Sequence, residues 1–152
     1  MPALPPARPP MLGALLRLAH QELVNQVALG LAEAGCGDVS PAQYAVCQQL
    51  GAAPEGKRLT DLAAYAGLSK PSMSALVEGL VRSGYVERVP DPLDGRAQLI
   101  RFTARGWAFS DVAVREVQRV EQAWAARVGT DQVETLRSIL QDLHRTRLER
   151  TD

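Results

Sequence analysis

Two polar clusters carry residue types that suit binding to nucleic acid. The first combines small hydroxyls with a lysine at the start of a predicted helix, and comprises Ser69, Lys70, Ser72, Met73 and Ser74. Hydroxyls and free N–H groups at a helix N-terminus suit phosphates and base edges, and a lysine reaches guanine or phosphate. We therefore expect these residues to contact DNA. The alternatives are a capped, solvated helix start and, for Met73 on the apolar face, a place in the core.

The second cluster is the charged turn DPLDGR at residues 91–96. Gly95 is expected to adopt a positive φ in this tight tip. Arg96 is placed to enter a minor groove, whose negative potential attracts a guanidinium group. Asp94 is close enough to orient Arg96 through a salt bridge. The alternative is an ordinary surface ion pair, worth about 0–1 kcal/mol.

A helix-turn-helix followed by a strand hairpin would position both clusters. Thr60 is expected to cap a short helix over residues 61–65, and Ser69 a second helix that ends near Arg82. Residues 85–89 and 97–102 alternate like strands on either side of the turn. Arg88 and Arg101, on these strands, are either phosphate contacts or solvated strand residues. The order predicts a winged helix-turn-helix lobe over residues 41–103.

Long helices flank this lobe at both ends of the chain. Apolar residues recur at spacings of three and four over residues 11–34 and again over 104–148, with a break at Gly129. Their apolar stripes exceed what a small winged lobe must cover, so both segments are expected to form a dimer interface. Residues 1–10 contain five prolines and predict a disordered arm. We expect a single, mainly α domain over residues 11–152 with a small β-hairpin.

Composition and charge narrow the function classes. The net charge of the 152 residues is zero, whereas residues 57–106 carry eight basic and five acidic side chains, a net charge of +3. No apolar run approaches the roughly 20 residues that a membrane span needs. The N-terminus lacks the apolar core of a signal peptide, which favours a cytoplasmic protein. With only two histidines, we expect no metal site. Because the sequence contains no catalytic motif, we expect neither enzymatic activity nor a bound cofactor.

The two cysteines, Cys36 and Cys47, share no motif and indicate no disulfide framework. Cys47 lies within a predicted helix, where buried packing is the better account. Cys36 lies in a glycine-flanked loop with no basic neighbour in sequence to lower its pKa. Sensing of oxidants through either thiol stays an alternative function.

The chain resembles the MarR family of bacterial transcriptional regulators. The resemblance is carried by LTDLA at 59–63, GLSKPS at 67–72, VER at 86–88 and, most specifically, DPLDGR at 91–96. It implies a homodimer that is usually a repressor. Many members of the family release DNA when a small, often aromatic ligand binds beside the lobe. It also makes Arg96 the minor-groove arginine and Asp94 its orienting partner. The family often has arginine at the position of Gly95 and a polar or basic residue at that of Ala75.

The combined interpretation is a DNA-binding transcriptional regulator. A two-fold dimer would place two recognition helices about 34 Å apart on a pseudo-palindromic operator. Tyr44, Trp107 and Trp124 are candidates to line a ligand pocket, although aromatics at helical spacing are more often core residues. A winged helix that serves protein contacts is the alternative, and the zero net charge fits it.

Overall fold

The computed structural model describes residues 9–149, with side chains described as far as Arg145, and places nine helices and strands in that range. In chain order they are α1 (Leu12–Glu33), α2 (Pro41–Gly51), β1 (Lys57–Arg58), α3 (Leu59–Ala66), α4 (Lys70–Arg82), β2 (Val86–Asp91), β3 (Asp94–Phe102), α5 (Ala104–Val128) and α6 (Thr130–Glu149). The mainly helical chain with a small antiparallel sheet confirms the predicted fold class. Of the predicted disordered arm, all but residues 9 and 10 lie outside the described residues.

Side-chain caps define the starts of α2, α4 and α5. The Ser40 side chain accepts from the backbone N–H of Gln43, whose side chain accepts from the Ser40 backbone N–H, a complete capping box before α2. Thr103 Oγ1 accepts from the Gly106 N–H at 3.1 Å and begins α5. The cap predicted at Thr60 is wrong, because α3 already begins at Leu59 and the N-cap residue, Arg58, makes no side-chain cap bond.

The sheet has three antiparallel strands in the order β1-β3-β2. The predicted hairpin is confirmed as β2 and β3, with Glu87 opposite Arg101. The third strand, β1, was not predicted, and it pairs Arg58 with Leu99 of β3. The sheet therefore ties the residue before α3 directly to the hairpin.

The core lies between the lobe helices and the inner face of this sheet. Met73, Val77 and Leu80 form the buried stripe of α4, as their spacing predicts, and each is at most 1% exposed. They belong to one apolar cluster with residues of α1, α2, α3, β3 and α5, including Leu62, Ile100 and Phe109. This packing fixes α4 against the base of the hairpin.

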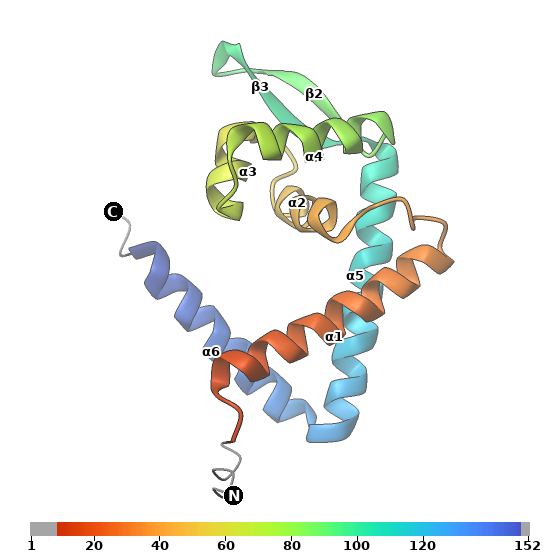
Figure 1. Cartoon of the computed structure of the whole chain (residues 1–152), viewed down its shortest axis with the longest axis vertical. Helices are drawn as coiled ribbons and strands as arrows, with labels where there is room; N and C mark the ends of the chain where they lie inside the picture. Colours follow the sequence, from red (N-terminus) through yellow and green to blue (C-terminus); the bar gives the residue numbers. More distant parts are fainter. Residues whose placement is uncertain (1–8, 150–152) are drawn as a thin grey trace, which may run out of the picture.

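The helices α1 and α6 lie mostly in the half of the molecule away from the wing hairpin (Figure 1). α1 packs against α5, and α6 makes its main contacts with α5 as well. Over residues 130–145, every side chain is exposed except that of the half-buried Val133. Large apolar side chains on α1 and α6 face solvent in the single chain: Leu12, Leu15, Leu16, Leu18, Leu136, Ile139, Leu140 and Leu143. Among residues 9–149, no helix combines the length and apolar character of a membrane span.

Candidate nucleic-acid interface

The start of α4 presents a short polar surface. Ser69 Oγ accepts from the Ser72 N–H at 3.2 Å and also lies 2.8 Å from Ser72 Oγ, which caps the helix. Lys70 is exposed and forms no ion pair with any described residue. Ser74 is half-buried, and its hydroxyl donates to Glu78 Oε1 at 3.1 Å. The capped helix start therefore presents Lys70 and the two hydroxyls to solvent, whereas Ser74 is engaged along the helix.

Met73 does not belong to this surface. Its side chain is fully buried in the core between α4 and the sheet. A DNA contact through Met73 is therefore wrong for this arrangement, and the alternative of a core residue holds. The apolar spacing of α4 explains the result, because Met73 begins the stripe that continues to Val77 and Leu80.

The tip of the hairpin is built differently from the expectation. Asp91 pairs with Asp94, so Pro92 and Leu93 form the turn, and proline suits the second position of a four-residue turn. Gly95 is not among the glycines with positive φ, so the predicted conformation is wrong. A Cβ added to Gly95 would meet nothing within 4 Å.

Asp94 acts on the backbone of the tip. Its Oδ1 accepts from the Arg96 N–H at 3.1 Å. No ion pair joins the side chains of Asp94 and Arg96, so the predicted orienting salt bridge is wrong. Arg96 is exposed, and none of the carboxylates in the described residues pairs with it. Its guanidinium group is thus available for an external anion.

An arginine that the sequence reasoning missed holds the base of this tip. Arg58 places Nε 2.7 Å and Nη2 2.6 Å from Asp91 Oδ2, and Nη2 lies 3.7 Å from Asp94 Oδ2. The other oxygen of Asp91 accepts from the Leu93 N–H at 2.9 Å. The Leu93 N–H and the Arg58 guanidinium group together lower the pKa of Asp91 from its usual value. Asp91 is only 6% exposed, so its charge depends on these partners.

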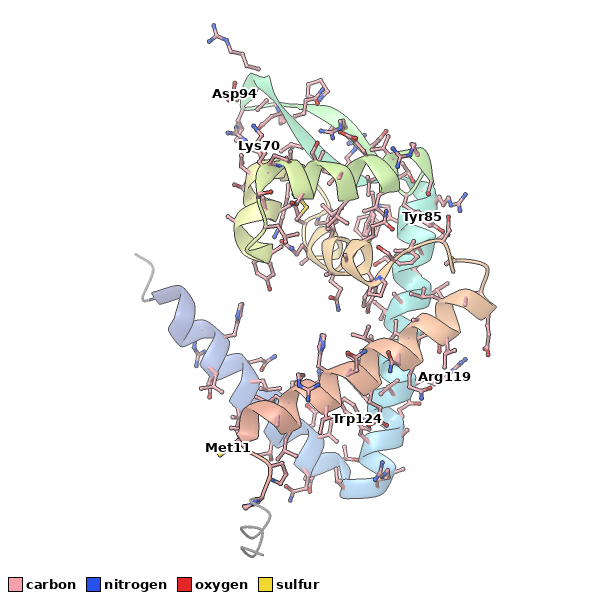
Figure 2. All side chains as sticks on the ribbon, in the orientation of Figure 1. Met11, Lys70, Tyr85, Asp94, Arg119 and Trp124 are labelled. Atoms are coloured by element: carbon pink, nitrogen blue, oxygen red, sulfur yellow. The ribbon has the colours of Figure 1, made fainter. Side chains whose placement is uncertain are left out.

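The other two arginines of the hairpin, Arg88 and Arg101, differ in whether a carboxylate pairs with them. Arg101 Nε lies 2.8 Å from Glu87 Oε1 in a cross-strand ion pair. Arg88 is half-buried and opposite Ile100. A phosphate contact by Arg101 would have to compete with Glu87. Lys70, Arg88 and Arg96 pair with no carboxylate of the described residues, and of these three Lys70 and Arg96 are exposed. Lys70 and the wing residue Asp94 lie in the half of the molecule opposite to Met11 and Trp124 (Figure 2).

The three aromatic residues predicted to line one pocket do not come together. Tyr44 lines a cavity of about 520 Å³ between α2, α5 and α6. Trp107 packs edge-on against Phe102, with ring centroids 5.2 Å apart, and does not line the cavity. Trp124 lines two other hollows, one beside α1 and one beside α6. The prediction of one pocket lined by all three residues is therefore wrong, and of the three only Tyr44 lines the cavity between α2, α5 and α6.

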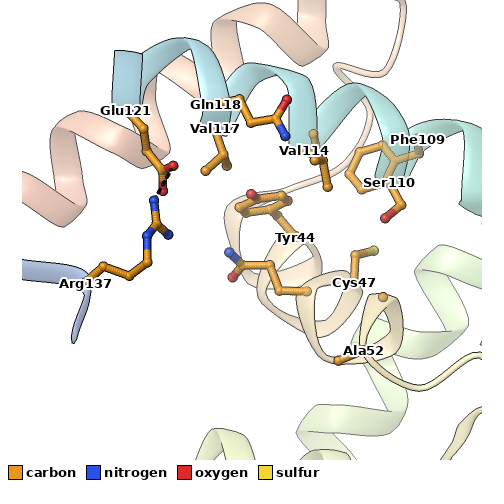
Figure 3. A pocket seen from close by; sticks show the side chains of 13 residues that line it. Tyr44, Cys47, Ala52, Phe109, Ser110, Val114, Val117, Gln118, Glu121 and Arg137 are labelled. Carbon is orange, nitrogen blue, oxygen red and sulfur yellow. Dashed lines mark hydrogen bonds and ion pairs between the residues drawn. The ribbon is translucent and has the colours of Figure 1, made fainter. Parts of the chain in front are cut away.

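The cavity at Tyr44 has an apolar wall and a charged rim. The Tyr44 ring lies between Val117 and Cys47 in the close view (Figure 3). Arg137 Nη2 lies 2.8 Å from Glu121 Oε2 at the rim, and Arg137 Nε lies 3.3 Å from Glu134. The only cation among the described lining residues is thus already paired. The uncharged polar groups along the wall are those of Tyr44, Gln48, Ser110 and Gln118.

The thiols differ in their surroundings. Burial raises the pKa of the Cys47 thiol to about 12, which leaves almost no reactive thiolate near neutral pH. Cys36 is half-buried in the loop after α1. Within the described part of the chain, no group of three or more His, Cys, Asp or Glu side chains is arranged to hold a metal ion.

Comparison with known proteins identifies the family. The sequence pattern of the MarR family matches residues 37–97. A probable transcriptional regulator from Pseudomonas aeruginosa is 30% identical, with 88% of this chain and 96% of that chain covered and a TM-score of 0.65. The reduced form of MarR from E. coli is 25% identical, with 90% and 98% covered and a TM-score of 0.73. The repressor CouR, bound to a 23-mer DNA duplex, is 27% identical, with 88% and 92% covered and a TM-score of 0.69.

The chain belongs to the MarR family of winged-helix regulators. The members of this family that it resembles are transcription regulators rather than enzymes. No curated protein sequence matches the chain.

Proposed function

We propose that this protein is a homodimeric, sequence-specific DNA-binding repressor. The observation that carries the proposal is the pair of unpaired cations, Lys70 at the start of α4 and Arg96 on the wing, on a lobe of the MarR family. Lys70 and the hydroxyls of Ser69 and Ser72 would meet the major groove, and Arg96 the adjacent minor groove. The relative CouR, solved with a DNA duplex, supports this reading.

The flanking helices support the dimer. Exposed leucines and isoleucine on α1 and α6 form an apolar surface that a monomer would leave in water. A two-fold partner would cover this surface and set the two α4 helices one DNA turn apart, about 34 Å. The operator would then be a pseudo-palindrome.

Release by a small molecule is the second part of the proposal. The cavity at Tyr44 lies between α2 of the lobe and the helices α5 and α6. A ligand bound there would contact both halves of the molecule and change the position of α2 relative to α5. Such a ligand would lower the affinity for DNA to the extent that it prefers the altered arrangement.

The test is selection of genomic DNA fragments by the purified protein at about 100–150 mM salt, since nonspecific binding weakens steeply with salt. Wild-type protein is expected to enrich one pseudo-palindrome, and Arg96→Ala to bind it much more weakly. Arg119→Ala is the matched control, because Arg119 is an exposed arginine on α5 paired with Glu116. Failure to enrich any sequence would contradict specific DNA binding and favour a module for protein contacts.

A further inference from the structure

We propose that Arg58 is the residue that positions the wing relative to the recognition helix, so that Arg96 reaches the minor groove only while Arg58 holds Asp91. This inference rests on the proposed DNA binding and assigns a role to a residue outside the DNA-contacting set. Arg58 stands 33 positions from Asp91 in sequence, and the fold brings the two together.

The backbone of Arg58 belongs to two elements at once. It is the second residue of β1, opposite Leu99 of β3, and it is also the N-cap residue of α3. α3 packs against α4, so Arg58 moves with the helix-turn-helix. The position of its side chain is therefore set jointly by the base of the sheet and by the helix-turn-helix.

The side chain of Arg58 reaches the wing at both residues that flank its turn. Nε and Nη2 both contact Asp91 Oδ2, at 2.7 and 2.6 Å, and Nη2 also approaches Asp94 Oδ2 at 3.7 Å. Asp91 in turn holds the Leu93 N–H, and Asp94 holds the Arg96 N–H. A single guanidinium group thus connects the helix-turn-helix to both backbone hydrogen bonds that shape the wing tip.

The chemistry of the contact requires an arginine. Two guanidinium nitrogens meet one carboxylate oxygen while one of them also faces a second carboxylate, which a single ammonium group cannot reproduce with the same geometry. Asp91 is 6% exposed, so water does not replace a lost partner easily. Loss of Arg58 therefore leaves the wing attached through the strands alone, with its tip free to change direction.

A direct phosphate contact is the competing role for Arg58. The two roles differ in the effect of Asp91→Asn. If Arg58 contacts phosphate, removal of the Asp91 charge frees the guanidinium group and raises the affinity for DNA. If Arg58 positions the wing, the same substitution weakens the contact that holds the tip and lowers the affinity, although it removes a negative charge near DNA.

The experiment measures binding to the selected operator for Arg58→Ala, Arg58→Lys, Asp91→Asn, Arg96→Ala and the double variant Arg58→Ala/Arg96→Ala, with Arg119→Ala as control. We expect Arg58→Ala and Arg96→Ala each to weaken binding about tenfold or more. We expect the double variant to be no weaker than Arg96→Ala alone, because Arg58 acts through Arg96. Arg58→Lys is expected to restore part of the loss, and Asp91→Asn to weaken binding.

Additive losses in the double variant, tighter binding by Asp91→Asn, or undiminished binding by Arg58→Ala would each overturn the inference. Amide hydrogen exchange provides a readout without DNA: the Leu93 and Arg96 N–H groups are expected to exchange faster in Arg58→Ala, with α4 unchanged. Unchanged exchange at both groups would also overturn it. If Arg58→Ala does not fold, Asp91→Asn and Arg58→Lys test the same contact between Arg58 and Asp91. The two proposals can be separated. If the wild-type protein binds no DNA but amide exchange at the wing is faster in Arg58→Ala, the contact between Arg58 and the wing stands. The proposed function and the role of Arg96 in this inference are then both overturned.

Discussion

The hydroxyl of Tyr85 donates a hydrogen bond of 2.7 Å to Asp38 Oδ1, which ties the turn after α4 to the loop before α2. The same hydroxyl accepts from Arg105 Nη2 at 3.2 Å, and the Arg105 guanidinium group lies 4.5 Å from the centre of the Tyr85 ring. Tyr85→Phe keeps the ring and removes both bonds. We expect the free energy of unfolding to fall by about 1–2 kcal/mol, measured by urea denaturation at pH 7.

The same tyrosine predicts a loss of stability at alkaline pH. Burial is the main cause that raises the pKa of Tyr85 to about 12, against about 10 in an unfolded chain. Between these values the unfolded state has released the proton and the folded state still holds it, so the free energy of unfolding falls as the pH rises. Tyr85→Phe is expected to reduce this fall, leaving the parts due to Tyr44 and Cys47, whose pKa values burial also raises. Equal pH slopes in both proteins would contradict the assignment.

Gly106 is required by close packing. A Cβ at this position would overlap the carbonyl oxygen of Tyr85 and lie against the Phe102 ring, and the backbone of Tyr85 cannot move aside cheaply. Gly106→Ala is expected to lower the free energy of unfolding by about 3 kcal/mol, measured by thermal or urea denaturation. Gly51→Ala is the matched control, because its Cβ would make an ordinary contact with Ser110 Oγ at 3.5 Å. Equal stability of the two variants would contradict the packing described here.

Gly95, unlike Gly106, has room for a side chain. Its φ lies outside the left-handed region and a Cβ would meet nothing within 4 Å, so the backbone accepts any side chain there. Gly95→Arg is expected to tighten operator binding and to steepen the slope of log K against log salt by about one, since it adds a phosphate-binding charge beside Arg96. Gly95→Ala separates the added charge from the loss of glycine and is expected to leave affinity and slope unchanged. An unchanged slope in Gly95→Arg would exclude a DNA contact at this position.

The two thiols are expected to react at different rates. Cys47 is buried and its pKa is raised to about 12, whereas Cys36 is half-buried in a loop. An alkylating reagent at pH 8 should modify one thiol of the native protein, Cys36, and the second only in denaturant. Mass spectrometry of peptides from Cys36→Ser and Cys47→Ser variants assigns the sites. Rapid modification of Cys47 in the native protein would revive a role for that thiol in redox sensing.

The charge of the cavity at Tyr44 predicts the class of effector. Because Arg137 is already paired with Glu121 and Glu134, a carboxylate ligand would find no free cation among the described lining residues. Neutral or cationic aromatic compounds are expected to raise the melting temperature and weaken operator binding, and aromatic acids to do neither. Val114→Trp, at the exposed rim of the cavity, should abolish the response. A stronger response to aromatic acids than to their neutral amides would contradict this prediction.

The sequence predicted the elements that follow a repeating pattern. The stripe of α4 and the alternation of β2 and β3 repeat over several residues, so their faces and order were recognisable. β1 was missed because two residues, Lys57 and Arg58, are too few to show an alternation. Its existence depends on Leu99 and Ile100, which lie some 40 positions further along the chain.

The errors at the wing have a common physical cause. Gly95 was expected to give the tip a positive φ, yet Pro92 set the turn two residues earlier and left Gly95 in the strand. Once the turn moved, the Asp94 carboxylate lay beside the Arg96 N–H rather than its guanidinium group. The partner of Asp91 was Arg58, a contact across the fold for which no local spacing gives a signal.

The unbroken length of α5 has a mechanical consequence. Its 25 residues form one rod of about 37 Å that starts at the sheet and ends at α6. Such a rod works as a lever: a tilt of about 5° about one end displaces the other by about 3 Å. In the proposed dimer, each copy contributes one lever, so the displacements of the two lobes add across the two-fold axis. A small molecule bound between α2 and α5 would then have to tilt α5 by only a few degrees. That tilt would change the separation of the two recognition helices, so that they no longer match consecutive major grooves.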